Sequence, residues 1–195
     1  MTRLVTTAAQ VLYLFAPLVV AAALSGLVLR FELLPALRRP IDAGRTFRGQ
    51  RWFGDNKTWR GVLVAIVGCV ATASAQKFVL ARALPGLALV RYEAMSLPEL
   101  VLFGVGLGGG ATLGELPNSF VKRQLGILPG QPARGALSTL FYVWDQIDLL
   151  AAWPLIAFWV RPTATLVAVS VVLVLAIHPV ISLIGFVIGA RRSAR

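Results

Sequence analysis

Long apolar stretches recur along this chain, and they constrain its fold more than any other feature. We predict spans at about residues 7–29, 61–84, 97–117, 136–160 and 163–190. Each is long enough for the roughly 20 residues that a helix needs to cross a bilayer core, where backbone groups must bond to one another. Charged residues make up only 14% of the chain, against about 25% in soluble domains. We therefore predict an all-α, polytopic integral membrane protein with five transmembrane helices in a single membrane domain, residues 1–195.

The distribution of basic residues predicts the orientation of these spans. Of the 19 lysines and arginines, 14 fall in the loops at about 30–60 and 118–135 and in the tail after residue 190, and the other 5 fall on the opposite side. Because short cytoplasmic loops carry the excess of Lys and Arg, the N-terminus should lie outside and the C-terminus in the cytoplasm of a cell (inner) membrane. The net charge of +11 is thus explained by topology, and we expect no nucleic-acid partner.

Three carboxylates lie within or at the ends of the predicted spans: Glu115, Asp145 and Asp148. An aspartate at a bilayer centre costs about 2.5–3.5 kcal/mol, so these groups need a cation, a metal or a water-filled cavity. Asp145 and Asp148 are three residues apart and share one helix face, where they can bind one ligand. The alternative is that the carboxylates pair with Lys122 and Arg123 and simply join two helices.

Pro117 decides whether a second polar stripe forms. If the helix continues through this proline, Glu115, Ser119 and Lys122 line one face at spacings of four and three residues. A proline within a membrane helix removes one backbone hydrogen bond and often opens a polar cavity. The sequence therefore predicts a charged site at the end of the third span.

The first predicted cytoplasmic loop, residues 40–61, mixes arginines, glycines, hydroxyls and aromatic side chains. Arg and Lys bind phosphates, glycines let backbone N–H groups approach an anion, and Trp or Phe can stack on a base. A polyphosphate nucleotide is a plausible ligand, although the Walker pattern is missing. The alternative is a topological determinant that contacts anionic membrane lipids.

The run Gly104-Val105-Gly106-Leu107-Gly108-Gly109 fits G-x-G-x-x-G, but it lies inside an apolar span without the strand that a dinucleotide site needs. Glycines four residues apart favour close helix packing instead, either within one chain or between two copies. The oligomeric state is not predicted. His178, the single histidine, is interpreted as a structural residue because it forms no zinc signature.

These motifs resemble those of the CDP-archaeol synthases, integral-membrane enzymes related distantly to CDP-diacylglycerol synthases. The most specific match is the first loop, with Pro40-Ile41-Asp42-x-Gly44-x-Thr46-Phe47 and then Phe53-Gly54-Asp55-Asn56-Lys57-Thr58-Trp59-Arg60-Gly61. Further matches are Gly114-Glu115-x-x-x-Ser119-Phe120-Val121-Lys122-Arg123, Asp145-Gln146-Ile147-Asp148 and His178-Pro179. The family typically has Asp where this chain has Glu115, Arg at Gln124 and Asn at Ser182.

The resemblance implies Mg²⁺-dependent transfer of a cytidylyl group from CTP to a lipid phosphate. It implies that the metal is bound by Glu115, Asp145 and Asp148, and that the phosphates are contacted by Lys122 and Arg123 with Asn118 and Ser119 beside them. It places the nucleotide site in the first loop, at Asp42, Asp55, Asn56, Lys57, Thr58 and Arg60. The acceptor stays open between an archaeal ether-lipid phosphate, phosphatidic acid and a related lipid. A noncatalytic protein that binds or transports anionic lipids or metal ions is the rival interpretation.

Overall fold

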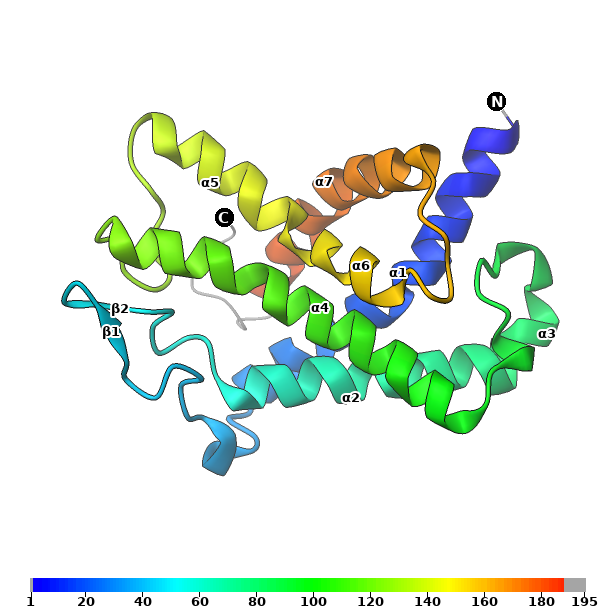
Figure 1. Cartoon of the computed structure of the whole chain (residues 1–195), viewed down its shortest axis with the longest axis horizontal. Helices are drawn as coiled ribbons and strands as arrows, with labels where there is room; N and C mark the ends of the chain where they lie inside the picture. The colour runs from blue at the N-terminus through cyan, green and yellow to red at the C-terminus, as the bar shows by residue number, and fades with distance from the viewer. Residues whose placement is uncertain (1, 188–195) are drawn as a thin grey trace.

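The computed structural model describes residues 2–187, and these residues form an almost entirely helical fold with one short hairpin (Figure 1). The end of the fifth predicted span and the arginines of the tail lie outside the described residues. The elements are α1 (Thr2–Arg30), β1 (Thr46–Phe47), β2 (Gln50–Arg51), α2 (Trp59–Ala75), α3 (Ala81–Ala83), α4 (Leu97–Gln124), α5 (Ala136–Ile147), α6 (Ala152–Ile156) and α7 (Ala164–Val187).

Three helical segments are long and apolar enough to cross a membrane: Arg3–Arg30, Trp59–Ala83 and Leu97–Gln124. A shorter apolar segment, Ala164–Ile177, belongs to α7. The prediction of an all-helical membrane protein is confirmed at this level. The three long segments correspond to the first three predicted spans.

The fourth predicted span is not the continuous helix that a simple span would form. It is divided into α5, a 3₁₀ turn at Asp148–Ala151 and α6. Pro154 lies inside α6 and has no N–H to donate to the carbonyl of Leu150, as a continuous α-helix would require. The division places Asp148 at the first residue of the 3₁₀ turn rather than in the middle of a helix.

Two helix starts have identifiable caps. The Thr58 hydroxyl accepts a hydrogen bond from Gly61 N at 3.3 Å and begins α2. Ser96 and Glu99 form a capping box at the start of α4, in which each side chain accepts from the other residue's backbone N–H. These caps define where the first loop ends and where the long central helix begins.

The glycine stripe of α4 packs within one chain, which settles the two packing alternatives. A Cβ at Gly104 or Gly108 would collide with the backbone of α2, and a Cβ at Gly110 would lie 2.6 Å from Ala152 Cα in α6. Gly114 touches the carbonyl of Asp148, where any side chain would clash. The glycines therefore let α4 contact α2 on one face and the 3₁₀ turn and α6 on the other, and the dinucleotide interpretation is excluded.

A polar contact is buried in the hydrophobic core at the end of the bundle that contains α3. Pro17 cannot donate a hydrogen bond to the carbonyl of Tyr13, one turn earlier in α1. Gln76 fills this vacancy by donating from Nε2 to Tyr13 O at 2.6 Å, and its Oε1 accepts from the Tyr92 hydroxyl at 2.9 Å. Gln76 is completely buried and begins the π-helical turn that follows α2, so these bonds join α1, this turn and the loop before α4.

The first loop closes on itself at its base and folds back toward the C-terminal part of α4 (Figure 1). Ile41 N donates to Lys57 O at 2.9 Å, and Trp59 N donates to Arg39 O at 3.0 Å. At its tip, Arg48 and Gly49 have positive φ and join β1 to β2 in a two-residue turn. The loop is thus an ordered structure next to the predicted charged site.

Candidate active site

The C-terminal half of α4 carries five of the thirteen predicted site residues, because the helix continues through Pro117 to Gln124. The condition for the polar stripe is therefore met. Asn118 and Ser119 are both buried, at 2% and 9% exposure. Lys122 follows one turn later on the face that carries Asn118, toward α5.

Lys122 and Asn118 both bind Asp145, which lies on α5. The Lys122 ammonium donates to both carboxylate oxygens at 2.5 and 2.7 Å, and Asn118 Nδ2 donates to Oδ1 at 2.7 Å. This contact joins α4 to α5. It agrees, for Lys122, with the alternative interpretation in which the carboxylates pair with Lys122 and Arg123 and join two helices. That alternative does not hold for Arg123, which makes no ion pair within the described part of the chain.

A second ion pair joins the first loop to α4. The Lys57 ammonium donates to a carboxylate oxygen of Glu115. Asp148 lies close enough to interact electrostatically with Glu115, Lys57 and Asp145. The structure thus brings the three predicted carboxylates and two predicted lysines into one cluster, assembled from the first loop, α4, α5 and the following 3₁₀ turn.

The three carboxylates do not form a ready-made metal centre. Among the described residues, no group of three or more His, Cys, Asp or Glu side chains is arranged to hold a metal ion. Glu115 and Asp145 are instead directed to Lys57 and Lys122. Their hard carboxylate oxygens nevertheless suit Mg²⁺, which usually binds through only one or two carboxylates together with waters and substrate phosphates.

Arg123 is the unusual cation of the site. It is 7% exposed, and its Nε and Nη1 atoms are buried without a hydrogen-bond partner among the residues described. Its side chain passes Gly54 of the first loop: a Cβ at Gly54 would lie 3.6 Å from Arg123 Cδ, 3.6 Å from Asn56 Oδ1 and 2.9 Å from Pro129 Cγ. Gly54 also has a φ of +90°, so both its conformation and the available space favour glycine. Arg123 and Asn56 therefore both lie beside Gly54.

Asp42 organises the first loop from its interior. Its fully buried carboxylate accepts hydrogen bonds from the Arg51 guanidinium and from the backbone N–H groups of Gly44, Phe53 and Gly54. Burial alone would raise the pKa of Asp42, but the Arg51 and backbone hydrogen bonds outweigh it and lower the pKa to about 2. The structure shows that this residue shapes the loop that carries Gly54 and Lys57.

The sequence prediction missed Arg51, although its spacing of four residues from Asp55 was a detectable signal. Arg51 Nη1 pairs with Asp55 at 2.9 Å, while Nη2 pairs with Asp42 at 2.6 Å. Two other predicted nucleotide ligands also have structural partners: Thr58 caps α2, and Arg60 Nη1 donates to Leu33 O at 3.1 Å. Their roles in nucleotide binding stay predictions.

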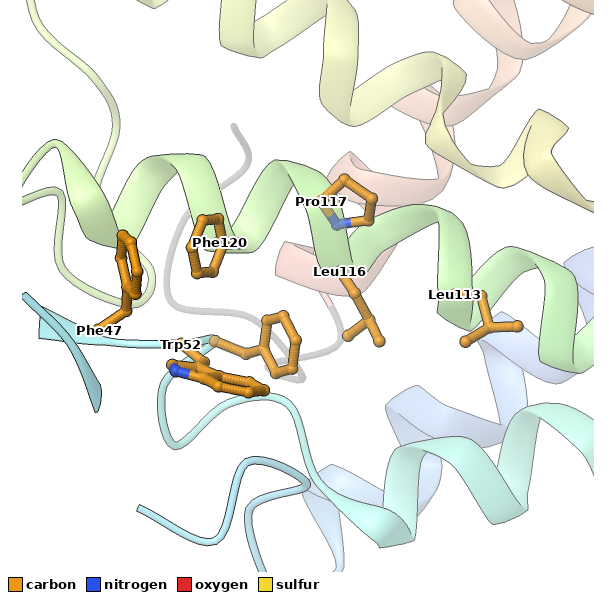
Figure 2. Close-up of a pocket in the computed structure, with 7 residues that line it drawn as sticks. Phe47, Trp52, Leu113, Leu116, Pro117 and Phe120 are labelled. Atoms are coloured by element: carbon orange, nitrogen blue, oxygen red, sulfur yellow. The ribbon is translucent and has the colours of Figure 1, made fainter. Parts of the chain in front are cut away.

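A second feature beside the charged cluster is an open apolar cleft of about 490 Å³ between the hairpin and α4 (Figure 2). Phe47 and Trp52 lie on the loop side, opposite Leu116 and Phe120 on α4. The rings of Phe47 and Phe120 are 5.9 Å apart. The cleft was not predicted, because the aromatic residues that line it come from two separate segments of the sequence.

Comparisons with known proteins agree on one family. A family model described as CarS-like CDP-archaeol synthase matches residues 3–193. The CDP-archaeol synthase of Archaeoglobus fulgidus is 35% identical over 80% of this chain and 84% of its own length. That of Methanoculleus marisnigri is 33% identical over 78% of this chain and 87% of its own. A solved structure, described as an intramembrane enzyme for archaeal membrane lipid biosynthesis, covers 86% of this chain and 89% of its own with 26% identity and a TM-score of 0.59.

Proposed function

The chain belongs to the CDP-archaeol synthase family, and we propose that its charged cluster is where a cytidylyl group passes from CTP to a lipid phosphate. Cytidylyl transfer to a lipid phosphate follows from the family. The observation that supports this location is the buried Arg123, whose Nε and Nη1 have no partner among the described residues. A buried guanidinium is costly unless an anion satisfies it, and the phosphates of the substrates are suitable anions.

We assign the phosphate contacts to Lys57, Lys122 and Arg123, with Asn118 and Ser119 beside them. In the structure Lys57 is paired with the carboxylate of Glu115, and Lys122 is paired with that of Asp145. When a nucleotide binds, these ammonium groups exchange a carboxylate for a phosphate oxygen. The carboxylates are then released for a second ligand, so the charges of the site remain balanced in both states.

We propose that this second ligand is Mg²⁺, held by Asp145, Asp148 and Glu115. When bound, the ion would neutralise charge on the phosphates and favour departure of pyrophosphate. The chain has the donors for this role, since Asp148 is near enough to both other carboxylates to interact with them electrostatically, and Mg²⁺ needs only one or two carboxylates.

The transfer itself needs positioning and charge stabilisation rather than a protein nucleophile. An oxygen of the lipid phosphate attacks the α-phosphorus of CTP and forms a new P–O bond. The bond from that phosphorus to the oxygen bridging to the β-phosphate breaks, and this oxygen leaves with pyrophosphate. Lys122 and Arg123 are consecutive residues near the end of α4, where they can stabilise charge on the transferring and leaving groups.

We further propose the complete topology of five spans, with the N-terminus outside and the site facing the cytoplasm. The positive-inside distribution supports it, and the divided segment α5–α6 serves as the fourth span. In this arrangement CTP arrives from the water and the lipid phosphate from the bilayer. We propose an archaeal ether-lipid phosphate as acceptor, because the matched relatives are CDP-archaeol synthases.

The decisive experiment measures CTP-dependent pyrophosphate release by the purified protein with Mg²⁺. Three parallel reactions contain the ether-lipid phosphate, phosphatidic acid or no lipid. Release with the ether-lipid phosphate alone supports the proposed acceptor, and release with phosphatidic acid reassigns it. Absence of release with every lipid, from protein that is still folded, favours the noncatalytic alternative in which the same cluster binds lipids or ions.

Carboxylate variants test the assigned residues. Asp145→Asn and Asp148→Asn should abolish release while leaving membrane insertion intact, because they remove charge without changing bulk. Glu93→Gln removes an exposed carboxylate in the loop before α4 and should retain full activity. Wild-type turnover in both aspartate variants would refute the metal assignment.

A further inference from the structure

We propose that the hairpin and the apolar cleft beneath it form a docking site for an anionic membrane lipid, separate from the charged cluster. One hydrocarbon chain lies in the cleft, and the lipid's phosphate lies against Arg45 and Arg48. The site is thus a second lipid contact, made by residues that take no part in the proposed transfer.

The cleft is placed where a lipid chain can enter it. Its wall on α4 extends from Leu113 to Phe120 (Figure 2), which corresponds to about 10 Å along a helix. Leu113 lies within a segment long and apolar enough to cross a membrane and is 57% exposed. The cleft is therefore continuous with the exposed apolar surface of a candidate membrane span, and it ends beneath the hairpin.

The charges around the cleft suit an anionic head group. Arg45 lies over the Trp52 ring at 5.9 Å and Arg48 over the Phe47 ring at 5.3 Å. Both arginines are exposed, and in the described residues neither forms an ion pair with a carboxylate. Arg51, the third arginine of the hairpin, differs because it already forms ion pairs with Asp42 and Asp55.

The combination of features identifies the ligand class. Aromatic and basic side chains together are typical of the interface between bilayer and water. A cleft lined almost entirely by carbon excludes a free phosphate as its main occupant, because a free phosphate has nothing to place there. A phospholipid satisfies both parts, with its chain in the cleft and its phosphate on the arginines.

Trp52 provides a direct probe of occupancy. Purified full-length protein in a neutral detergent is titrated with phosphatidylglycerol or phosphatidylcholine that carries brominated chains, which quench nearby tryptophans. The signal of Trp52 is the difference between the wild type and Trp52→Phe. We expect quenching by both lipids, with half-saturation at a lower mole fraction for the anionic one. About 1 kcal/mol per basic residue near an anionic surface corresponds to about a fivefold preference for each arginine.

Charge variants test the proposed head-group contact. R45Q/R48Q should reduce the preference for phosphatidylglycerol to near unity while quenching by phosphatidylcholine persists. R82Q/R91Q removes two exposed arginines from the connection between α2 and α4 and should keep the preference. Both double variants should retain CTP-dependent pyrophosphate release at saturating lipid, so failure of this proposal is distinguishable from failure of the proposed function.

Three outcomes would overturn the docking site. The first is an absence of any Trp52-dependent quenching by either lipid. The second is a preference for the anionic lipid that survives in R45Q/R48Q. The third is relief of the quenching when CTP is added to the protein with brominated lipid but without the acceptor lipid phosphate, which would assign the aromatic cleft to the nucleotide base instead.

Discussion

Replacing Arg123 by methionine should stabilise the protein and strongly reduce its activity. The guanidinium is almost entirely buried, and two of its nitrogen atoms have no partner among the described residues. An unsatisfied buried polar group costs about 1–3 kcal/mol, and a charged one costs more. Methionine keeps the apolar stem that passes Gly54 and removes the unsatisfied N–H groups. We therefore expect a gain of about 2 kcal/mol in the free energy of unfolding.

The same substitution removes a donor that we place on the substrate phosphates. Loss of a single preorganised donor to a developing negative charge typically reduces turnover by about 100- to 1,000-fold. Arg123→Met should therefore lower pyrophosphate release by at least about 100-fold. The opposite signs are diagnostic, because a residue that merely supports the fold loses stability and activity together.

Both effects are measured on one preparation, by thermal unfolding in detergent and by pyrophosphate release. For a chain of this size, about 2 kcal/mol corresponds to a rise of about 4–8 °C in Tm. Arg91→Met, an exposed arginine before α4, serves as the control and should change neither quantity. A lower Tm for Arg123→Met would refute the argument from unsatisfied burial, and undiminished turnover would refute its role at the phosphates.

Three further predictions concern the framework of the site. Gly114→Val should push the 3₁₀ turn of Asp148 away from α4, lowering Tm and turnover together, whereas Gly109→Ala, which has open space around it, should leave both unchanged. Gln76→Leu leaves two buried groups unpaired and should cost about 2–4 kcal/mol of stability, with the KM for CTP unaffected. The pKa of Asp42 is lowered to about 2, so its ionised form should contribute about 2–3 kcal/mol. That contribution is present above about pH 4 and is lost as the pH falls toward 2; denaturation curves of the wild type and Asp42→Asn that remain parallel over this range would contradict it.

Much of the helical framework could be predicted because it follows from local rules. Runs of apolar residues indicated the three long helices, and glycines spaced four residues apart indicated close packing along α4. The division of the fourth segment was harder to foresee. It depends on Pro154 together with the contact between Gly114 and Asp148, and the second of these involves residues far apart in sequence.

The candidate site was predicted residue by residue but not pair by pair. Charge and spacing singled out Glu115, Lys122 and Asp145, and the family resemblance added Lys57. The structure brings these four residues together in two ion pairs. Sequence could not show that Lys57 contacts Glu115, because a 58-residue separation gives no local signal. Nor could it distinguish Arg123, which is buried and has no ion pair within residues 2–187, from its neighbour Lys122, which has one.

The pairing also explains how so many charges are tolerated at the end of a membrane helix. Three carboxylates left alone in hydrocarbon would cost about 2.5–3.5 kcal/mol each. Ion pairs with Lys57 and Lys122 offset this cost for Glu115 and Asp145. The two lysine side chains are only 18% and 14% exposed, against 44% and 45% for the carboxylates, so breaking such a pair without a replacement would chiefly leave a largely buried ammonium group uncompensated. A ligand that supplies anions to the lysines satisfies these ammonium groups, and the metal–triphosphate complex that we propose would also supply a cation to the carboxylates.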